Sequence, residues 1–282
     1  MENVSQQSAL RRCQLIQQQM LDLFVAICER HHLQYFLSYG TLLGAMRHKG
    51  AIPWDDDLDV AMLKRDYQKF LKVAPRELPP HILLQTPRSV PGAFEYFAKL
   101  RDQRTFFLEA HSACQAPNGV FIDIFPLVEF PDVSQRTRTV LAGGISYSWR
   151  KERKHRTMRH RYILGVFSSG LQAMFWRLMR MVLKVCVHVM CWFKATILLA
   201  AAEAGNRRYA YRKEDVFPLG EAEYDGKRYA VPHNPDAILT AFYGDWRQPP
   251  PENCRGGYHT RWIGLDGPIP SQWSFPPCGW RE

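Results

Sequence analysis

The sequence predicts an α+β fold, because helix-like and strand-like patterns both occur along it and no internal repeat is visible. Apolar residues between Leu10 and Arg30 recur at the spacings of three and four that are typical of a helix. From Asp57 to Met62 charged and apolar residues alternate, which is the period of a strand. The run from Val120 to Phe125 predicts a second strand, with a single carboxylate in its middle.

The remaining elements of the first half follow in order. Tyr35–Leu37 is a short apolar run that predicts a strand, and Gly40–Met46 indicates the turn from this strand into a helix. Another helix is expected from about Asp66, and Pro79-Pro80 comes after it. Further strands are expected at residues 82–85, 94–100 and 105–108.

The second half contains the most apolar stretch of the chain, residues 171–202. Cations interrupt this stretch, so it lacks the ~20 clean apolar residues of a membrane-spanning helix. Four of them recur at spacings of three and four and define one stripe of a basic amphipathic helix; they are Arg177, Arg180, Lys184 and His188. Such a helix either lies on an anionic membrane surface or packs within the protein with one face in water.

Turn signals mark the elements that follow this helix. Asp225-Gly226, at the centre of residues 223–229, predicts a β-hairpin. Asn234-Pro235 is typical of a helix N-cap and first helical position, and Gly244 of the helix end. The C-terminal residues are rich in Pro, Gly and Trp, and we expect an ordered wrap without regular structure.

The composition is that of an ordinary globular protein, with 46% apolar and 23% charged residues among 282. The net charge of +10 is concentrated, since residues 136–161 contain nine basic residues and only Glu152 opposes them. Such a field attracts phosphate on a nucleotide, a lipid surface or a nucleic acid. It is also compatible with a solvated basic face that only keeps the protein soluble.

Seven widely spaced cysteines, an odd number, argue against a disulfide framework, and no C-x-x-C pair indicates zinc. Residues 1–19 are polar and lack the apolar core of a secretory signal. These features predict a cytoplasmic protein. The basic helix favours the alternative that the protein attaches peripherally to the inner face of the membrane.

Three acidic residues form the candidate metal site. If Asp57 and Asp59 lie on one strand, their side chains point to the same side, ~7 Å apart, and repel each other unless a cation sits between them. Asp123 is the single acidic residue of its apolar strand, and a buried carboxylate needs compensation. Carboxylate oxygens suit Mg²⁺. The alternative for the triplet at residues 55–57 is a solvated turn or a helix cap.

Gly40-Thr41 lies at the expected turn from strand to helix, where backbone N–H groups favour anions. Glycine allows a phosphate to approach the backbone, and the threonine hydroxyl adds a hydrogen-bond donor. The pair is a weak signal alone, because most such pairs are only turns. Together with the acidic residues it predicts a site for a metal-bound phosphate compound.

The same segments carry a resemblance to a known family. The motifs are YGTLLGAMRHKG at 39–50, IPWDDDLDV at 52–60, KLRD at 99–102, GVFIDIFP at 119–126, VFPL at 216–219, YGDW at 243–246 and Pro249-Pro250. With them the chain resembles the LicD family of phosphocholine transferases. The likeness covers roughly residues 8–130 and 214–260 of a single domain expected to span 1–282. No family motif occurs in the middle, 132–212, which is expected to be a basic, amphipathic helical insertion.

This resemblance implies a nucleotidyltransferase-like mixed β-sheet flanked by helices. It implies phosphate binding at Gly40 and Thr41, and Mg²⁺, with Mn²⁺ as the alternative, at Asp57, Asp59 and Asp123. At Tyr39-Gly40 the chain departs from the family, which often has two small residues before the threonine. This difference is expected to narrow the phosphate pocket.

The activity implied by the resemblance is transfer of phosphocholine, or a similar phospho-alcohol, from CDP-choline to a hydroxyl of a glycan or lipid-linked glycan such as lipopolysaccharide or teichoic acid. Animal relatives of the family, fukutin and its kin, transfer ribitol phosphate. Asp123 is the candidate base for the acceptor. The candidates for donating hydrogen bonds to phosphate oxygens are Arg47, His48, Lys99 and Arg101, with His259 as a weaker one. Each can also be explained as a structural or ion-pair residue.

Two other classes of function remain open at this point. A nucleotidyltransferase of the same fold would release pyrophosphate instead of CMP. A non-catalytic protein would bind an anionic membrane or nucleic acid through residues 136–194, independently of Asp57 and Asp59. No RNA-binding aromatic motif is present, so no specific nucleic-acid partner is expected.

Overall fold

The computed structural model describes residues 2–86, 89, 97–109, 119–132, 165–193, 197–201, 210–255 and 260–264. The chain divides into two compact units. The first contains residues 1–126 and 218–282, and the second contains residues 127–217. Each unit is described by itself.

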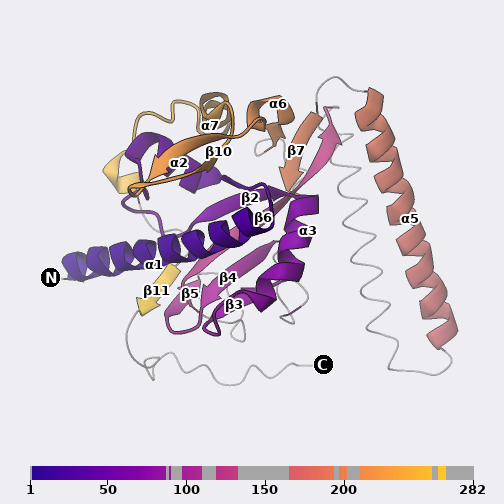
Figure 1. The fold of residues 1–282 in the computed structure, drawn as a ribbon, viewed down its shortest axis with the longest axis horizontal. Coiled ribbons are helices and arrows are strands. Elements are labelled where there is room, and N and C mark those ends of the chain that lie inside the picture. The colour runs from indigo at the N-terminus through magenta and orange to yellow at the C-terminus, as the bar shows by residue number, and fades with distance from the viewer. Residues whose placement is uncertain are drawn as a thin grey trace. The chain divides into compact units, whose positions relative to one another are not determined.

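The first unit is built on a sheet with the strand order β1-β2-β6-β4-β3 (Figure 1). The strands β1 and β2, β3 and β4, and β4 and β6 pair antiparallel. The Asp123 N–H of β6 donates to the Leu58 carbonyl just before β2, at 2.8 Å. The strands are β1 (Phe36–Leu37), β2 (Asp59–Leu63), β3 (Ile82–Gln85), β4 (Ala98–Asp102) and β6 (Phe121–Pro131), of which β6 continues into the second unit.

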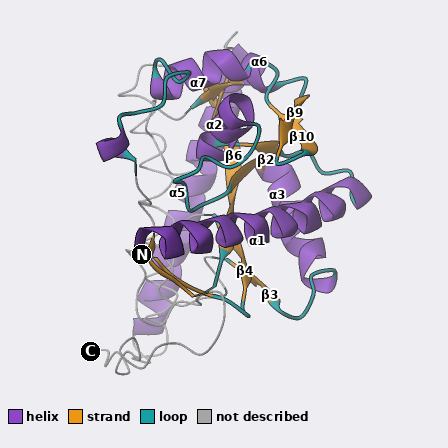
Figure 2. Cartoon of the chain, turned by 90° about the vertical axis from the view of Figure 1, so that its left-hand side faces the viewer, coloured by secondary structure: helices purple, strands orange, loops and turns teal. Residues whose placement is uncertain are grey.

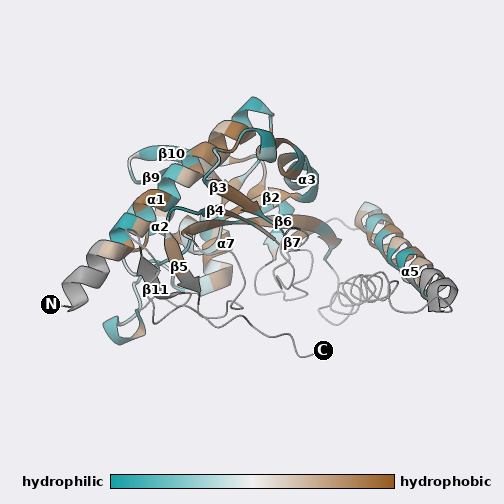
Figure 3. Ribbon diagram, turned by 90° about the horizontal axis from the view of Figure 1, so that it is seen from below, coloured by the Kyte–Doolittle hydropathy of each residue, from teal (hydrophilic) through white to brown (hydrophobic). Residues whose placement is uncertain are grey.

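Helix α1 (Glu2–Arg30) crosses this sheet (Figures 1 and 2) and packs through its apolar residues. Phe24 contacts Tyr35 and Phe70, with ring centroids 5.3 and 5.0 Å away, and Phe70 belongs to α3 (Lys64–Val73). Hydrophobic residues dominate β3 and β6, whereas α1 alternates between polar and apolar residues (Figure 3). The core therefore lies between the sheet and the helices that cover it.

The first unit also contains helix α2 (Tyr39–His48). A 3-10 turn, η1 (Ala74–Arg76), follows α3, and a second, η4 (Glu252–Cys254), follows α7. The remaining elements are the antiparallel pairs β9 (Gly220–Tyr224) with β10 (Lys227–Val231) and β5 (Phe106–Glu109) with β11 (Thr260–Gly264), and helix α7 (Pro235–Tyr243).

Turn chemistry positions the hairpin and α7 as the sequence predicts. Asp225 and Gly226 both have positive φ, 46° and 78°, which suits the two central residues of a tight hairpin turn. The Asn234 side chain accepts a hydrogen bond from the Ala237 N–H and caps α7. Gly244, at φ 71°, ends the helix. These predictions are confirmed.

The second unit contains the end of β6, which pairs antiparallel with β7 (Ile197–Ala201). Strand β7 pairs antiparallel with β8 (Tyr211–Arg212), and α6 (Lys213–Val216) follows. The long helix α5 (Gly165–Phe193) packs Val187 and Cys191 against Phe130 of β6. Among the residues the structure describes, no helix is long and apolar enough to cross a membrane.

The α+β class is confirmed, and three local predictions need correction. Strand β2 begins at Asp59, so Asp57 lies in the preceding loop. Residues 132–212 are not purely helical, because Ile197–Ala201 forms a strand that pairs with the apolar end of β6. A strand, β11, also occurs in the C-terminal part that was expected to lack regular structure. The basic stretch at 136–161 lies outside the described residues, and the nucleotidyltransferase-like topology stays a prediction.

Candidate active site

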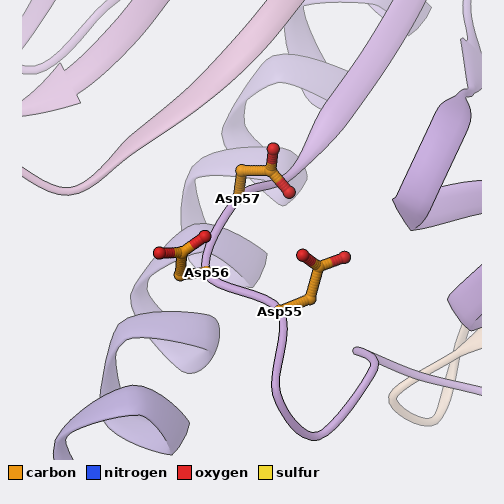
Figure 4. A group of neighbouring side chains, drawn as sticks. All are labelled: Asp55, Asp56 and Asp57. Atoms are coloured by element: carbon orange, nitrogen blue, oxygen red, sulfur yellow. The ribbon is translucent and has the colours of Figure 1, made fainter. Parts of the chain in front are cut away.

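The acidic loop before β2 brings three carboxylates together. Ligand oxygens of Asp55, Asp56 and Asp57 all lie within 4.8 Å of one another. Asp55 and Asp57 extend on the same side of the loop and point toward each other, whereas Asp56 extends on the other side (Figure 4). Burial and then the charges of Asp57 and Asp56 raise the pKa of Asp55 well above its ordinary value.

Asp56 faces helix α1 instead of the other two carboxylates. Its side chain is fully buried. Burial, with an added effect of the Asp56 charge, raises the pKa of Cys13 on α1 to about 12. Within this loop, Asp55 and Asp57 therefore point toward each other, and Asp56 belongs to the contact with α1.

Asp59 of β2 and Asp123 of β6 extend this acidic region. Burial, and then the charges of Asp57, Asp123 and Asp55, raise the pKa of Asp59 well above its ordinary value, whereas Lys99 lowers it. The buried Lys99 ammonium lies 3.2 Å from Asp123 Oδ1. The Lys99 ammonium thus lies beside a group of interacting carboxylates.

This set of ligands fits a hard divalent cation, because carboxylates that repel one another are stabilised by an ion between them. Among the described residues, the group with the closest spacing is Asp55, Asp56 and Asp57. Asp59 and Asp123 lie outside that closest group, but Asp59 interacts electrostatically with Asp55, Asp57 and Asp123. The arrangement therefore includes Asp55, which the sequence analysis assigned only to a turn or a cap.

Two glutamines of α1 hold the acidic loop by its backbone. Gln14 Nε2 donates to the carbonyls of Ile52 and Asp55, at 3.0 and 2.9 Å. Gln17 Nε2 donates to the carbonyls of Asp56 and Phe121, at 2.9 and 3.2 Å. Gln17 therefore connects the loop to the start of β6, two residues before Asp123.

The hairpin turn at Asp225 holds the beginning of the same loop. The Asp225 N–H donates to the Lys49 carbonyl at 2.7 Å, and Arg11 donates two hydrogen bonds to the Asp225 carboxylate. A Cβ at Gly50 would lie only 2.5 Å from Asp225 Oδ1, so this contact requires glycine. The loop is thus fixed at both ends.

Gly40 and Thr41 both contact the acidic segment. A Cβ at Gly40 would lie 2.7 Å from Asp55 Oδ2, so the absence of a side chain makes room for that carboxylate. The Thr41 hydroxyl accepts a hydrogen bond from the Asp59 N–H at 2.7 Å. The sequence analysis assigned both residues to phosphate, and that assignment stays a prediction.

Basic and aromatic groups border the acidic loop on the side of α2. Arg47 donates to His48 Nε2 and to the Trp246 carbonyl. Burial and then the nearby Arg255 lower the pKa of Arg47, whereas Asp55 raises it. Burial and then the charges of Arg47 and Arg255 lower the pKa of His48. The Arg255 guanidinium lies 4.7 Å from the Trp54 ring centroid.

Arg101 has a different environment from the other residues that are predicted to bind phosphate. It has no exposed surface, and its guanidinium donates to the Gln85 side chain and to the Gly119 carbonyl. It also lies over the Phe121 ring. These contacts indicate that Arg101 supports the sheet. His259 lies outside the described residues.

The structure thus brings together most of the predicted site residues and adds others. Gly40, Thr41, Asp57, Asp59, Lys99 and Asp123 surround one acidic region, with Arg47 and His48 beside it. Asp55, Gln14, Gln17 and Arg255 were not predicted as site residues from the sequence. Polar glutamines on the apolar face of α1 were the available signal for two of them, whereas Arg255 has no local signal.

Part of the chain matches a known family model. Residues 32–164, which contain the acidic loop and Asp123, match the family model described as "LicD/FKTN/FKRP, nucleotidyltransferase domain". This part of the chain is therefore similar to a LicD-family domain.

Three individual relatives are similar to the chain over different lengths. Lipopolysaccharide cholinephosphotransferase LicD of Haemophilus influenzae is 29% identical over 260 residues, which cover 89% of this chain and 96% of that protein. Shorter matches are an uncharacterized protein of Rickettsia typhi, 34% identical over 24% of each chain, and one of Rickettsia prowazekii, 40% identical over 17% of this chain and 18% of that protein.

Proposed function

We propose that this chain transfers phosphocholine, or a closely similar phospho-alcohol, from a CDP-activated donor to a hydroxyl of a cell-surface glycan. The observation that carries the proposal is the group of interacting carboxylates, Asp55, Asp57, Asp59 and Asp123, within a part of the chain that is similar to a LicD-family domain. The relative named lipopolysaccharide cholinephosphotransferase aligns over nearly its whole length, which favours lipopolysaccharide as acceptor. Teichoic acid is the alternative acceptor.

In this proposal Asp57, Asp59 and Asp123 hold a divalent cation, Mg²⁺ or Mn²⁺. When bound, the cation neutralises charge on the donor diphosphate. Asp55 adds its carboxylate to the same region, and Gly40 and Thr41 border the diphosphate. Arg47, His48 and Arg255 donate to phosphate oxygens from the side of α2.

The transfer itself is an in-line displacement. The acceptor hydroxyl oxygen forms a bond to the phosphorus that carries choline, and the bond from that phosphorus to the bridging oxygen breaks, so CMP leaves. The hydroxyl proton passes to the Asp123 carboxylate. Lys99, 3.2 Å from Asp123 Oδ1, holds this carboxylate in position.

Asp59→Asn tests this assignment, because it keeps the size of the side chain and removes a ligand charge. We expect Mg²⁺-dependent release of CMP from CDP-choline to fall at least ~100-fold. Glu221→Gln, an exposed residue of β9, is the control. Survival of the activity within a fewfold in Asp59→Asn would show that the metal assignment is wrong. If the protein released pyrophosphate from CTP, and did not release CMP from CDP-choline, this result would favour nucleotidyl transfer.

We also propose that α5 places the protein on an anionic membrane surface, where a lipid-linked acceptor is found. An apolar stripe of α5 is exposed, from 54% at Leu178 to 81% at Trp192, and also includes Met174, Met181 and Val185. Arg177, Lys184 and His188 flank the stripe, and α5 contains no acidic residue. This combination is typical of a helix in the membrane interface. Pairing of two copies of α5 is a less favourable way to cover the stripe, because it would bring the basic residues of the two helices together.

Vesicle sedimentation tests this second proposal. We expect binding to vesicles with anionic lipids, weakening with salt, and loss of binding in Leu178→Glu. Leu15→Glu, at a leucine of α1 that is 42% exposed, is the matched control and should bind normally. Equal binding by both variants would contradict the assignment to α5.

A further inference from the structure

Aromatic side chains border the acidic region in the first unit. The Tyr39 and Phe125 rings have centroids 5.1 Å apart and planes at 75°, so they form a corner. Phe97 lies against Phe125, with a centroid distance of 4.4 Å. We call Tyr39, Phe97 and Phe125 the aromatic corner. Phe242 of α7 stacks on Tyr39 at 6.0 Å and supports it from a buried position.

The chain places this aromatic corner beside the carboxylates. Phe125 follows Asp123 by two residues on β6, so the two side chains are on the same face of the sheet. Phe97 precedes Lys99 by two residues, and Lys99 is directly opposite Asp123 in the β4–β6 register. Tyr39 precedes Gly40, against which the Asp55 carboxylate lies.

The three rings differ from the rings of the core. Phe36, Phe70 and Phe107 are at most 1% exposed, whereas Tyr39, Phe97 and Phe125 each keep some exposed surface. Tyr39 also has φ +44°, an unfavourable conformation for a bulky residue. The fold therefore maintains a strained backbone at the residue that directs a ring toward Phe125.

We propose that the aromatic corner binds the quaternary ammonium group of the transferred alcohol, an inference that rests on the proposed function. Ring faces attract a cation whose methyl groups are weakly hydrated, and such rings are the common binding site for choline-like groups. The nearby carboxylates add attraction for a cation. Lys99 already lies 5.4 Å from the Phe97 ring centroid, so Tyr39 and Phe125 are assigned the main contact.

The position also matches the chemistry of the donor. Phosphocholine carries its ammonium group on a short ethylene spacer from the phosphate. A phosphate at the acidic region therefore brings the ammonium group to a neighbouring surface. Phe125, two residues along β6 from Asp123, lies in that neighbourhood.

A series of donors tests the charge preference. The intact protein is assayed with CDP-choline, CDP-ethanolamine and the neutral isostere CDP-3,3-dimethylbutanol, in which carbon replaces nitrogen. We expect kcat/KM for the choline donor to exceed that for the isostere by about tenfold or more. Equal turnover of the choline donor and its isostere would overturn the proposal.

Ring variants locate the preference. We expect Tyr39→Leu and Phe125→Leu to raise KM for the choline donor about tenfold and to change KM for the ethanolamine donor much less. Tyr39→Phe keeps the ring and should retain the ratio of the two donors. Equal losses with both donors in Tyr39→Leu and Phe125→Leu would show that the rings only support the fold.

A binding measurement separates this proposal from the proposed function. Phosphocholine is titrated with the protein, and the NMR shift of its methyl protons is followed. We expect a ring-induced upfield shift that is lost in Tyr39→Leu. Binding with this shift but without any transfer would leave the aromatic corner standing and contradict the transferase. Transfer of choline without the shift would contradict the aromatic corner alone.

Discussion

At the scale of single residues, the acidic site depends on side chains that are small or neutral. Gly40 leaves room for the Asp55 carboxylate, and the Thr41 hydroxyl accepts a hydrogen bond from the Asp59 N–H. The backbone of Asp59 is thereby fixed next to Asp123, whose N–H bonds to the Leu58 carbonyl. Neutral contacts thus help the Lys99 ammonium to hold carboxylates that repel one another close together.

Thr41 gives a prediction at this scale. Thr41→Val has nearly the same shape but cannot accept the hydrogen bond from the buried Asp59 N–H. We expect it to lower the free energy of unfolding by about 1–3 kcal/mol in urea titrations, because the N–H is left without its partner. Thr41→Ser keeps the hydroxyl and should lose clearly less. Equal losses in the two variants would show that the methyl group, not the hydroxyl, matters.

The pair Asp102–Arg104 gives a pH-dependent prediction. Burial disfavours the charged Asp102 carboxylate, but hydrogen bonds from Arg104 outweigh it and lower the pKa of Asp102. A carboxyl group with a lowered folded-state pKa stabilises the fold above its unfolded pKa of ~3.9, and this contribution disappears as pH falls through the folded pKa. We expect Asp102→Asn to destabilise the protein at neutral pH in urea titrations, and much less at pH ~2. A loss that does not depend on pH would contradict the charge effect.

At the scale of elements, α1 organises the site although it contributes no carboxylate to it. One face of α1 buries Cys13, Phe24 and other apolar residues against the sheet. The same face carries Gln14 and Gln17, which donate to backbone carbonyls of the acidic loop. The helix therefore sets the position of the loop relative to β6.

Matched variants of α1 test this role. Gln14→Ala and Gln17→Ala remove hydrogen-bond donors from carbonyls of the acidic loop, and we expect each to lower the free energy of unfolding by about 1–3 kcal/mol. We also expect lower kcat with KM for the donor little changed, because the loop loses its position. Gln19→Ala, on the exposed face of α1, should change neither. If all three variants behave alike, α1 does not position the loop.

At the scale of the whole molecule, local patterns predicted elements well where they involved near neighbours. The hairpin at Asp225-Gly226 and the cap at Asn234 follow from backbone preferences of the residues themselves, and both are confirmed. The strand at Ile197–Ala201 was predicted as helix, because an apolar run has no period that separates the two. Pairing with β6, about 70 residues earlier in the chain, decides its structure.

The site was predictable in the same uneven way. Asp59 and Asp123 were predicted as site residues because single carboxylates stand out in apolar strands, and their role stays a prediction. Arg255 was not predicted, because its contact with the Trp54 ring and its charge effect on Arg47 arise only when segments about 200 residues apart in the chain meet. The KLRD motif predicted that Arg101 binds phosphate, but the fold buries this side chain completely.

The most direct test of the central claim is the effect of Mg²⁺ on the thermal unfolding of wild type and Asp59→Asn. Saturating Mg²⁺ should raise the Tm of the wild type by about 5 °C or more, because it binds only the folded carboxylates. Asp59→Asn should have a higher Tm than the wild type without Mg²⁺, since repulsion is relieved, and should gain little from the ion. The metal site would be contradicted if Mg²⁺ did not change the Tm of the wild type, or if it raised the Tm of Asp59→Asn by the same amount.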